Sequence, residues 1–348
     1  MPSIQLIVGS YNSPDNQPTI HRFELDTETG RSSMIESFAG ISNPSYIATP
    51  EKGVLLAVNE DCKPDDGITV LHLKNNEYQK IQKVSGEGSA PCHVALSPDY
   101  SLAVTANYLG GSVSVFPYDK NTGTIGIPDV IQFTGKGPDE RRQAGPHAHF
   151  VTFTPDGRYM IVPDLGADAI HIIPMIDGKP DGLHKTDLKL TSGSGPRHIV
   201  FNRKGNVAYL VSELAGTVTI IDYDSKTGNL IPRKIVELDP NHAHASADIH
   251  LSPDGRFLYA SNRRVEDGLV CFSVDLSGDL NRVGFTSTGC HPRNFTITPD
   301  GKLVLVACRD DNRIEVYRRN VETGALIQMS EIGCPLPVCI LLENSETI

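Results

Sequence analysis

The sequence predicts an all-β fold, a seven-bladed β-propeller with four antiparallel strands per blade. Three observations predict it: two hairpin motifs that recur along the 348-residue chain, and one repeat unit that is divided between the two chain ends. The N- and C-terminal strands would share that divided blade and close the ring. We therefore expect one propeller domain over residues 1–348.

The first motif is a Pro-led apolar strand, a turn resembling Ser/Thr-Pro-Asp-Gly, and a second apolar strand. Apolar runs bounded by turn residues are typical of hairpins. Six copies can be aligned on one turn residue each: Pro50, Pro98, Pro155, Arg203, Pro253 and Pro299. Subtracting these residue numbers gives intervals of 46 to 57 residues, which is the length of a four-stranded blade.

The second motif is an alternating strand followed by an Asp/Thr/Gly turn and another strand. It occurs seven times, starting at Thr19, Ile68, Ser112, Ala169, Thr217, Leu269 and Arg313. One copy of the first motif is therefore missing, and the chain ends supply it. Residues 4–11 resemble its second strand and residues 334–342 its Pro-led first strand. Pairing of the two ends would remove an open sheet edge.

The composition of the chain excludes several classes of binding partner. A formal net charge of −11 argues against nucleic acid and against an anionic membrane surface. No apolar run approaches the length of a membrane span, and the N-terminal residues do not resemble a signal peptide. Seven cysteines, an odd number without C-x-x-C spacing, are expected to be free buried thiols in a reducing cytoplasm. We expect no cofactor and no metal, although His242 and His244 in NHAHAS leave a metal site open.

One end of the ring collects charged residues. In a propeller, the chain enters the innermost strand and leaves the second strand at the same face, which we call the mouth. Six residues before each turn marker stand Pro44, Cys92, His149, Arg197, Ala247 and Arg293. The second strands end near Asn59, Asn107, Asp164, Glu213, Asn262-Arg263 and Cys308-Arg309. The long connection over residues 132–145 would overhang the mouth.

Plainer interpretations remain open for several of these residues. Arg197 and Glu213 could form only a buried ion pair. Asp164 could satisfy backbone N–H groups, and Arg309 could pair with Asp310. His198 and His250 lie one residue off the ring by strand parity, which favours packed positions within a strand.

The functional interpretation is a pocket with several cations, one or two carboxylates and a histidine. Arginine binds carboxylate or phosphate with two donors and stays charged. Histidine or glutamate can take a proton from water. The sequence lacks a nucleophile elbow, a phosphate-binding loop and a dinucleotide fingerprint. The residues alone thus predict an enzyme or binder for a small anion.

The chain resembles the seven-bladed lactonase family, which includes bacterial 6-phosphogluconolactonase and the fungal carboxy-muconate cyclase. The resemblance rests on PHAHFVTFTPDGRYMIVPDLGAD, GSGPRHIVFNRKGNVAYLVSEL, ADIHLSPDGRFLYASNR and PRNFTITPDGK. It implies active-site residues at His149, Arg197, Glu213 and Arg263. Arg264 is a rival for Arg263 and His147 a rival for His149. We expect Arg293, His147, His198 and Arg264 to bind substrate.

The resemblance implies metal-free hydrolysis of 6-phospho-D-glucono-1,5-lactone to 6-phosphogluconate, in the oxidative pentose phosphate pathway. Arg197 would stabilise the oxyanion, Arg263 and Arg293 would hold the phosphate, and Glu213 or His149 would be the base. The alternative is a lactonase or lactonizing cycloisomerase for another small anionic lactone, such as a carboxymuconolactone. An interaction propeller is disfavoured because the chain is only 6% aromatic. We expect a monomer or weak homodimer.

Overall fold

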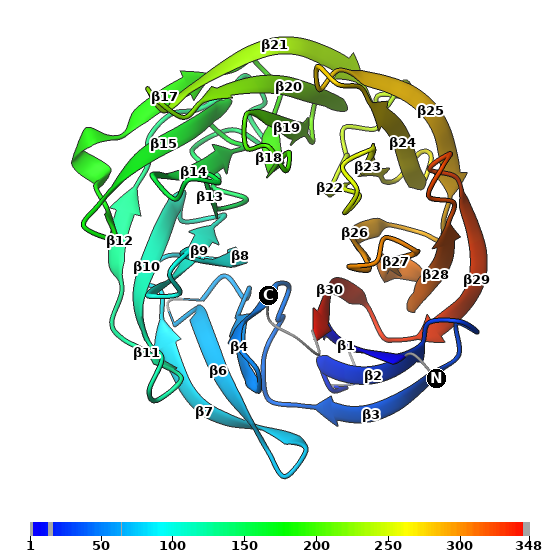
Figure 1. Cartoon of the computed structure of the whole chain (residues 1–348). Coiled ribbons are helices and arrows are strands. Elements are labelled where there is room, and N and C mark those ends of the chain that lie inside the picture. Colours follow the sequence, from blue (N-terminus) through cyan, green and yellow to red (C-terminus); the bar gives the residue numbers. More distant parts are fainter. Residues whose placement is uncertain (1–2, 13–16, 64, 344–348) are drawn as a thin grey trace.

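Seven β-sheets stand side by side in a closed ring (Figure 1). The computed structural model describes residues 3–12, 17–63 and 65–343. Within these residues every strand pairing is antiparallel, and each sheet follows the predicted order from an inner to an outer strand. The expected seven-bladed β-propeller is therefore confirmed.

The three sheets that follow the chain start, each given from its innermost strand outward, have the following bounds. The closing sheet contains β30 (Pro337–Glu343), β1 (Ser3–Ser10), β2 (Ile20–Asp26) and β3 (Ser32–Phe38). The next contains β4 (Ile47–Glu51), β5 (Val54–Val58), β6 (Gly67–Lys74) and β7 (Glu77–Ser85). The third contains β8 (Pro91–Leu96), β9 (Leu102–Asn107), β10 (Ser112–Asp119), β11 (Thr124–Ile125) and β12 (Asp129–Gln132).

The remaining four sheets complete the ring. The fourth contains β13 (Thr152–Phe153), β14 (Tyr159–Asp164), β15 (Ala169–Ile176), β16 (Lys179–Pro180) and β17 (Thr186–Lys189), and the fifth contains β18 (Pro196–Phe201), β19 (Val207–Ser212), β20 (Thr217–Asp224) and β21 (Asn229–Glu237). The sixth contains β22 (Ile249–Leu251), β23 (Phe257–Asn262), β24 (Gly268–Val274) and β25 (Leu280–Ser287). The seventh contains β26 (Pro292–Ile297), β27 (Leu303–Cys308), β28 (Arg313–Arg319) and β29 (Leu326–Gly333). Two short 3₁₀ turns, η1 (Gly182–His184) and η2 (Arg309–Asp311), lie in connections.

Two blades differ from the expected four strands. Their outer strand is divided into two short segments, β11 with β12 and β16 with β17, each pairing with the same third strand. A proline, Pro117 or Pro174, lies within that third strand in each of these blades. Proline lacks the backbone N–H that a continuous ladder requires, and it is tolerated where pairing is interrupted.

The ring closes through its two ends. Strand β1 pairs with β30 from Gln5–Glu343 to Ser10–Pro337, with one irregularity after Gly9. Both strands come from the divided repeat unit, so the predicted closure is confirmed. In Figure 1 they lie side by side in the same blade, at opposite ends of the colour scale.

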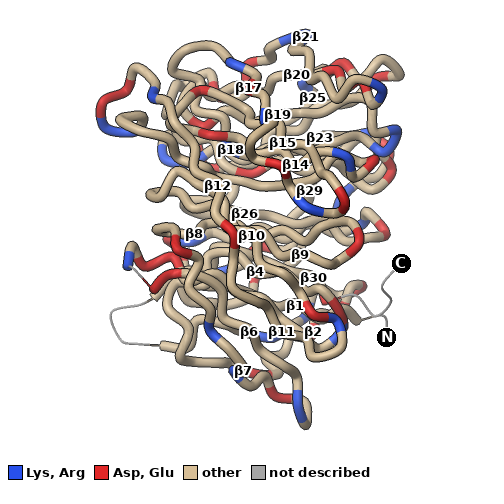
Figure 2. Tube along the Cα trace, turned by 90° about the vertical axis from the view of Figure 1, so that its left-hand side faces the viewer, with Lys and Arg blue, Asp and Glu red and all other residues tan. Residues whose placement is uncertain are grey.

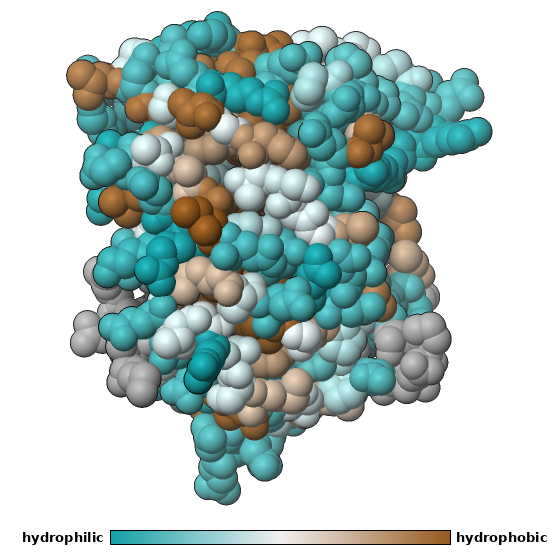
Figure 3. All heavy atoms as spheres, turned by 90° about the vertical axis from the view of Figure 1, so that its right-hand side faces the viewer, coloured by the Kyte–Doolittle hydropathy of each residue, from teal (hydrophilic) through white to brown (hydrophobic). Residues whose placement is uncertain are grey.

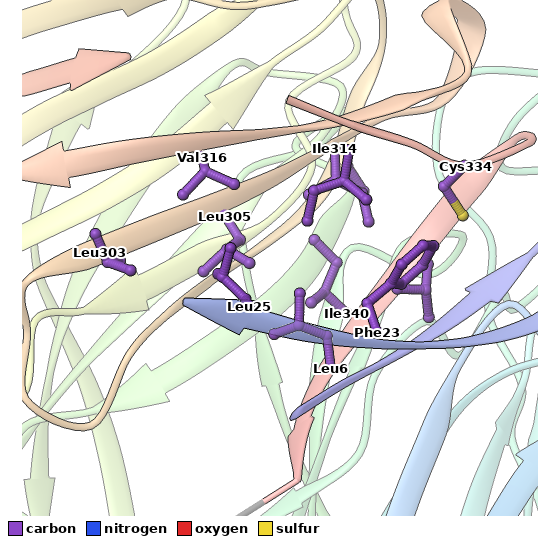
Figure 4. Close-up of a cluster of buried hydrophobic side chains, with 12 residues drawn as sticks. Leu6, Phe23, Leu25, Leu303, Leu305, Ile314, Val316, Cys334 and Ile340 are labelled. Carbon is purple, nitrogen blue, oxygen red and sulfur yellow. The ribbon is translucent and has the colours of Figure 1, made fainter. Parts of the chain in front are cut away.

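The hydrophobic core lies between blades rather than at the centre of the ring. Among the described residues, one cluster of buried apolar side chains fills each interface between neighbouring sheets. At the closing interface, Leu6 and Phe23 pack against Leu305 and Ile314, as Figure 4 shows. Each blade thus buries both faces only when both neighbours are present.

A shared irregularity at the start of the innermost strand directs side chains into the mouth. The pairing register shifts beside Cys92 in β8, Arg197 in β18 and Arg293 in β26, in each case directly after a proline. A β-bulge locally bends the strand and re-aims a side chain. This repeated feature explains why the residue after each proline leaves the normal alternation of the strand.

Charged residues lie mostly on turns and connections, while the strands are largely uncharged in the edge-on view of Figure 2. On the side drawn in Figure 3, exposed hydrophobic residues form separate patches among hydrophilic ones. All seven cysteines are free as expected, but Cys62 and Cys290 are exposed, contrary to the expectation of buried thiols. None of the helices described is long and apolar enough to cross a membrane.

Deleting everything after Gly333 should abolish cooperative folding, because it removes β30 and leaves the inner edge of β1 unpaired. Thermal unfolding followed by far-UV circular dichroism would measure this, together with the elution volume in size-exclusion chromatography. The matched control is a chain that ends at Glu343 and keeps all of β30. A sharp melting transition in the shorter chain would contradict the dependence on closure.

Candidate active site

A polar cavity of about 320 Å³ opens at the predicted mouth. A volume of this size suits a small metabolite. Its wall combines five arginines with two carboxylates and a few neutral groups: Arg142, Arg263, Arg264, Arg293, Arg309, Glu60, Glu213, Tyr11, Tyr108, Cys92, His149 and His291. The excess of cations favours an anionic occupant.

Glu213 is the centre of this charge cluster. It follows β19, and its backbone N–H donates to the carbonyl of Gly195 at 2.7 Å. Its Oε2 lies 2.8 Å from Arg197 Nε and 3.2 Å from Arg263 Nη2. Its Oε1 lies 2.7 Å from Arg142 Nη2. The carboxylate is 4% exposed, so three guanidinium groups take the place of water around it.

The three arginines determine the protonation of Glu213. Burial alone would raise the pKa of this carboxyl group, but the charges of Arg263, Arg197 and Arg142 outweigh burial and lower the pKa to about 2. Glu213 is therefore ionised at neutral pH, and it is a weak base as long as all three cations surround it.

Arg197 lies beneath the cavity floor rather than on it. Its residue is 1% exposed, and it does not line the cavity. Besides Glu213, its Nη1 donates to the carbonyl of Ala247 at 2.6 Å and lies 3.2 Å from His198 Nε2. The geometry thus departs from the expected contact of Arg197 with a substrate oxygen. Arg197 orients Glu213 and contributes charge.

The loop that leads into β18 is shaped for this placement. Gly195 has a φ of 61°, and a Cβ there would come within 2.5 Å of Leu214. Its N–H donates to Asp168 Oδ1 at 2.8 Å, and the N–H of Gly193 donates to Oδ2 at 2.7 Å. A side chain at position 195 would therefore displace the residue next to Glu213.

His149 is the cavity's neutral proton acceptor. It is 6% exposed and lines the cavity, and its Nδ1 is buried without a hydrogen-bond partner among the described residues. Burial holds its pKa well below the usual value, and the charges of Arg197, His198 and Arg293 add to this effect. The imidazole is consequently neutral near pH 7 and can accept a hydrogen bond.

His198 and His147, which were expected to bind substrate, do not line the cavity. His198 is held between Arg197 and Asp248, with its Nδ1 2.8 Å from Asp248 Oδ1. His147 stacks on Tyr108, with ring centroids 4.5 Å apart, and its Nδ1 lies 2.8 Å from the Tyr108 carbonyl. Neither histidine lines the cavity, so both act through the residues that they contact.

The other predicted arginines differ in how far contacts within the protein already occupy their guanidinium groups. Arg263 is 5% exposed, and its three nitrogens are engaged by Ala245, His291 and Glu213. This leaves it poorly suited to the expected role of holding a phosphate. Arg264 is exposed and lines the cavity. Arg293 also lines the cavity, above the Tyr11 ring at 5.3 Å and 3.9 Å from Glu60 Oε2.

The structure bears on the plainer interpretations left open for Asp164 and Arg309, and on the possible metal site. Asp164 accepts the N–H groups of His147, Gly166 and Ala167 at 2.7 to 3.0 Å, which makes it a backbone cap. Arg309 pairs with Asp310 at 2.6 Å, although it still lines the cavity. In the part of the chain that the structure describes, no group of three or more His, Cys, Asp or Glu residues is arranged to hold a metal ion.

Arg142 is the main residue that motif reasoning missed. It belongs to the long connection after β12, which was expected to overhang the mouth, and that expectation is confirmed by its contact with Glu213. The signal in the sequence was the 57-residue interval between Pro98 and Pro155, the longest of the series. Interval length located the loop but could not indicate which of its residues reaches inward.

Three of the other missed residues follow from a one-residue register error. The cavity takes the residue just beyond Asn59 and Asn107, namely Glu60 and Tyr108, and likewise Tyr11 after β1. Glu213, Arg263 and Arg309 occupy the same position in their blades. A stricter alignment of the second strands would have predicted all six.

The fold and this cavity together define a seven-bladed β-propeller with an arginine-rich mouth that also contains a neutral histidine. The chain matches the family described as "Lactonase, 7-bladed beta-propeller" over residues 5–342, and it belongs to that family. It is 32% identical to a 6-phosphogluconolactonase of Bacillus subtilis (strain 168), with 96% of each chain covered.

Solved structures agree with this assignment. A crystal structure from Bacteroides fragilis superposes with a TM-score of 0.91 at 38% identity, covering 98% of both chains. The periplasmic gluconolactonase PpgL of Pseudomonas aeruginosa superposes with a TM-score of 0.88 at 28% identity, covering 98% of this chain and 99% of PpgL.

Glu213→Gln should destabilise the fold by about 3–5 kcal/mol at pH 7, because it leaves Arg197 and Arg263 buried without their counter-charge. The folded pKa of Glu213 lies below its unfolded value, so the contribution is present above the unfolded pKa and is lost as pH falls toward about 2. Urea unfolding followed by circular dichroism at neutral and acidic pH measures both effects.

The control for this substitution is Glu140→Gln, which changes an exposed glutamate on the same loop as Arg142. It should leave stability unchanged. A Glu213→Gln protein as stable as the parent at pH 7 would show that the three arginines do not depend on this carboxylate.

His149 should remain neutral as pH is lowered from 8 to about 6, because burial and nearby cations lower its pKa below the usual value of about 6.5. Since the unfolded chain takes up a proton there, this residue should reduce stability as pH falls below that value. A histidine NMR titration, with the resonance assigned by its loss in His149→Gln, measures this. A midpoint at or above 6.5 would contradict the electrostatic argument.

Proposed function

We propose that this protein hydrolyses 6-phospho-D-glucono-1,5-lactone to 6-phosphogluconate. The observation that carries the proposal is one cavity in which Glu213 and His149, two groups that can accept a proton, lie among five arginines. Lactone hydrolysis needs a base for water and positive charge for the developing oxyanion. A phosphorylated substrate needs further cations, and the cavity has them.

The reaction follows from these groups. The base takes a proton from water while the water oxygen bonds to the lactone carbonyl carbon, and negative charge collects on the carbonyl oxygen. Collapse of this intermediate breaks the bond between the carbonyl carbon and the ring oxygen. The ring oxygen takes the proton back from the base and becomes a hydroxyl group. The new carboxylic acid then ionises.

The roles that we propose for the arginines differ from those expected from the sequence. Arg293 lines the cavity and stays charged, which suits it to the oxyanion contact; such a donor is typically worth about 3–4 kcal/mol. Arg264, exposed at the rim, suits the phosphate group. Arg197 and Arg263 support Glu213 from below and beside it.

The closest competing function is hydrolysis of an unphosphorylated sugar lactone, because the similar Pseudomonas aeruginosa protein is a periplasmic gluconolactonase. The five cavity arginines favour the phosphorylated substrate. A cytoplasmic location and a step in the oxidative pentose phosphate pathway are part of this proposal, supported by seven free cysteines and by the Bacillus subtilis relative.

A coupled assay tests the proposal. Glucose 6-phosphate dehydrogenase generates the lactone, and 6-phosphogluconate dehydrogenase reports the product over the spontaneous rate. His149→Ala should lower kcat by roughly 10²- to 10⁴-fold if His149 is the base, and less if Glu213 is. His184→Ala, which changes an exposed histidine of η1 that does not line the cavity, is the control. No acceleration by the folded parent protein would overturn the proposed function.

A further inference from the structure

Arg142 differs from the other arginines that contact Glu213. Arg197 and Arg263 are buried, and both contact Oε2. The Arg142 side chain is 30% exposed, and among the described residues it is the cation whose guanidinium group contacts Glu213 Oε1, at 2.7 Å. Oε1 is therefore covered by a single, partly hydrated partner, while Oε2 keeps two buried ones.

The backbone that carries Arg142 is fixed, although its side chain is accessible. The N–H groups of Arg141 and Arg142 donate to Asp139 Oδ1 at 2.9 and 3.1 Å. Gln143, which is 0% exposed, donates from Nε2 to the carbonyl of Leu165 at 2.8 Å and to Asp168 Oδ1 at 2.7 Å. These contacts anchor the backbone on both sides of Arg142, while its side chain remains partly exposed.

Asp168 links this loop to the segment that leads into β18. The same carboxylate accepts from Gln143 and from the N–H groups of Gly193 and Gly195, which stand four and two residues before Arg197. The loop is therefore positioned against the chain segment that places Arg197 beneath Glu213. Arg142 stands over the carboxylate with its backbone held on both sides.

We propose that Arg142 is a phosphate-responsive residue: it leaves Glu213 Oε1 for the phosphate of the incoming lactone, and this exchange exposes Oε1 to the attacking water. The inference rests on the proposed function and assigns the base to Glu213. A phosphate monoester carries a charge of about −1.5 to −2 and three acceptor oxygens, whereas a carboxylate carries one charge. The exchange is favourable in charge, because the partly exposed Arg142 gives up one negative charge for nearly two, while the buried Arg197 and Arg263 remain beside Glu213.

The exchange also changes the basicity of Glu213 in the required direction. Arg142 is one of three cations that lower the pKa of this carboxyl group, so its departure raises the pKa. Glu213 thereby becomes a better base only when a phosphate is present. Without a phosphate, the covered oxygen keeps the activity toward unphosphorylated lactones low.

Arg142→Ala separates this role from a purely structural one. With 6-phosphogluconolactone, kcat/KM should fall by about 10- to 100-fold, because a charged hydrogen bond is lost. With unphosphorylated glucono-1,5-lactone, kcat/KM should instead rise several-fold, since Oε1 is permanently uncovered. Arg141→Ala removes the neighbouring exposed arginine, which does not line the cavity, and should change neither value.

Calorimetric binding of 6-phosphogluconate and of gluconate makes the test independent of turnover. Arg142→Ala should weaken binding of 6-phosphogluconate at least tenfold relative to Arg141→Ala, while gluconate binding should not weaken. Equal losses for the two ligands, or for the two lactones, would overturn the exchange. Absence of turnover in the parent protein would overturn the proposed function, and the binding comparison would still decide whether Arg142 recognises phosphate.

Discussion

Closure of the ring by β1 and β30 is the constraint on which the rest of the structure depends. Each hydrophobic cluster lies between two blades, so no blade can bury both faces without two neighbours. Closure also fixes the direction of every inner strand, so that the bulges at Cys92, Arg197 and Arg293 open toward one face. Residues more than 280 positions apart in the sequence, such as Tyr11 and Arg293, line the same cavity because the blades form a closed ring.

This rigidity allows charges to be buried at close range. Taking ions out of water costs several kcal/mol each, and the cost is offset only by good geometry. Glu213 meets three guanidinium groups at 2.7 to 3.2 Å, each from a different part of the chain. Two buried cations, Arg197 and Arg263, contact Oε2, while the partly exposed Arg142 contacts Oε1.

The repeat pattern carried enough information to predict the fold, the divided blade and the mouth, because blade hairpins leave periodic signals in the chain. It also grouped His149, Arg197, Glu213 and Arg293 at one face. The sequence could not predict which of these side chains line the cavity and which are buried beneath it, because neither a β-bulge nor burial behind a neighbour leaves a periodic signal. Arg197 therefore appeared equivalent to Arg293, although only Arg293 lines the cavity. Arg142 lies outside the repeat altogether, and Glu60 and Tyr108 were displaced by one position in the alignment.

The charges that line the cavity do not balance one another. Five arginines face two carboxylates there, and His149 keeps a buried Nδ1 without a partner among the residues described. The chain as a whole is acidic, so this concentration of positive charge is local and is maintained by the scaffold. An anionic ligand offsets the repulsion among the arginines, and it also raises the pKa of any base that those arginines suppress. In the proposed mechanism, substrate charge therefore acts twice, once in binding and once in raising the basicity of Glu213, and an uncharged lactone of the same shape lacks both effects.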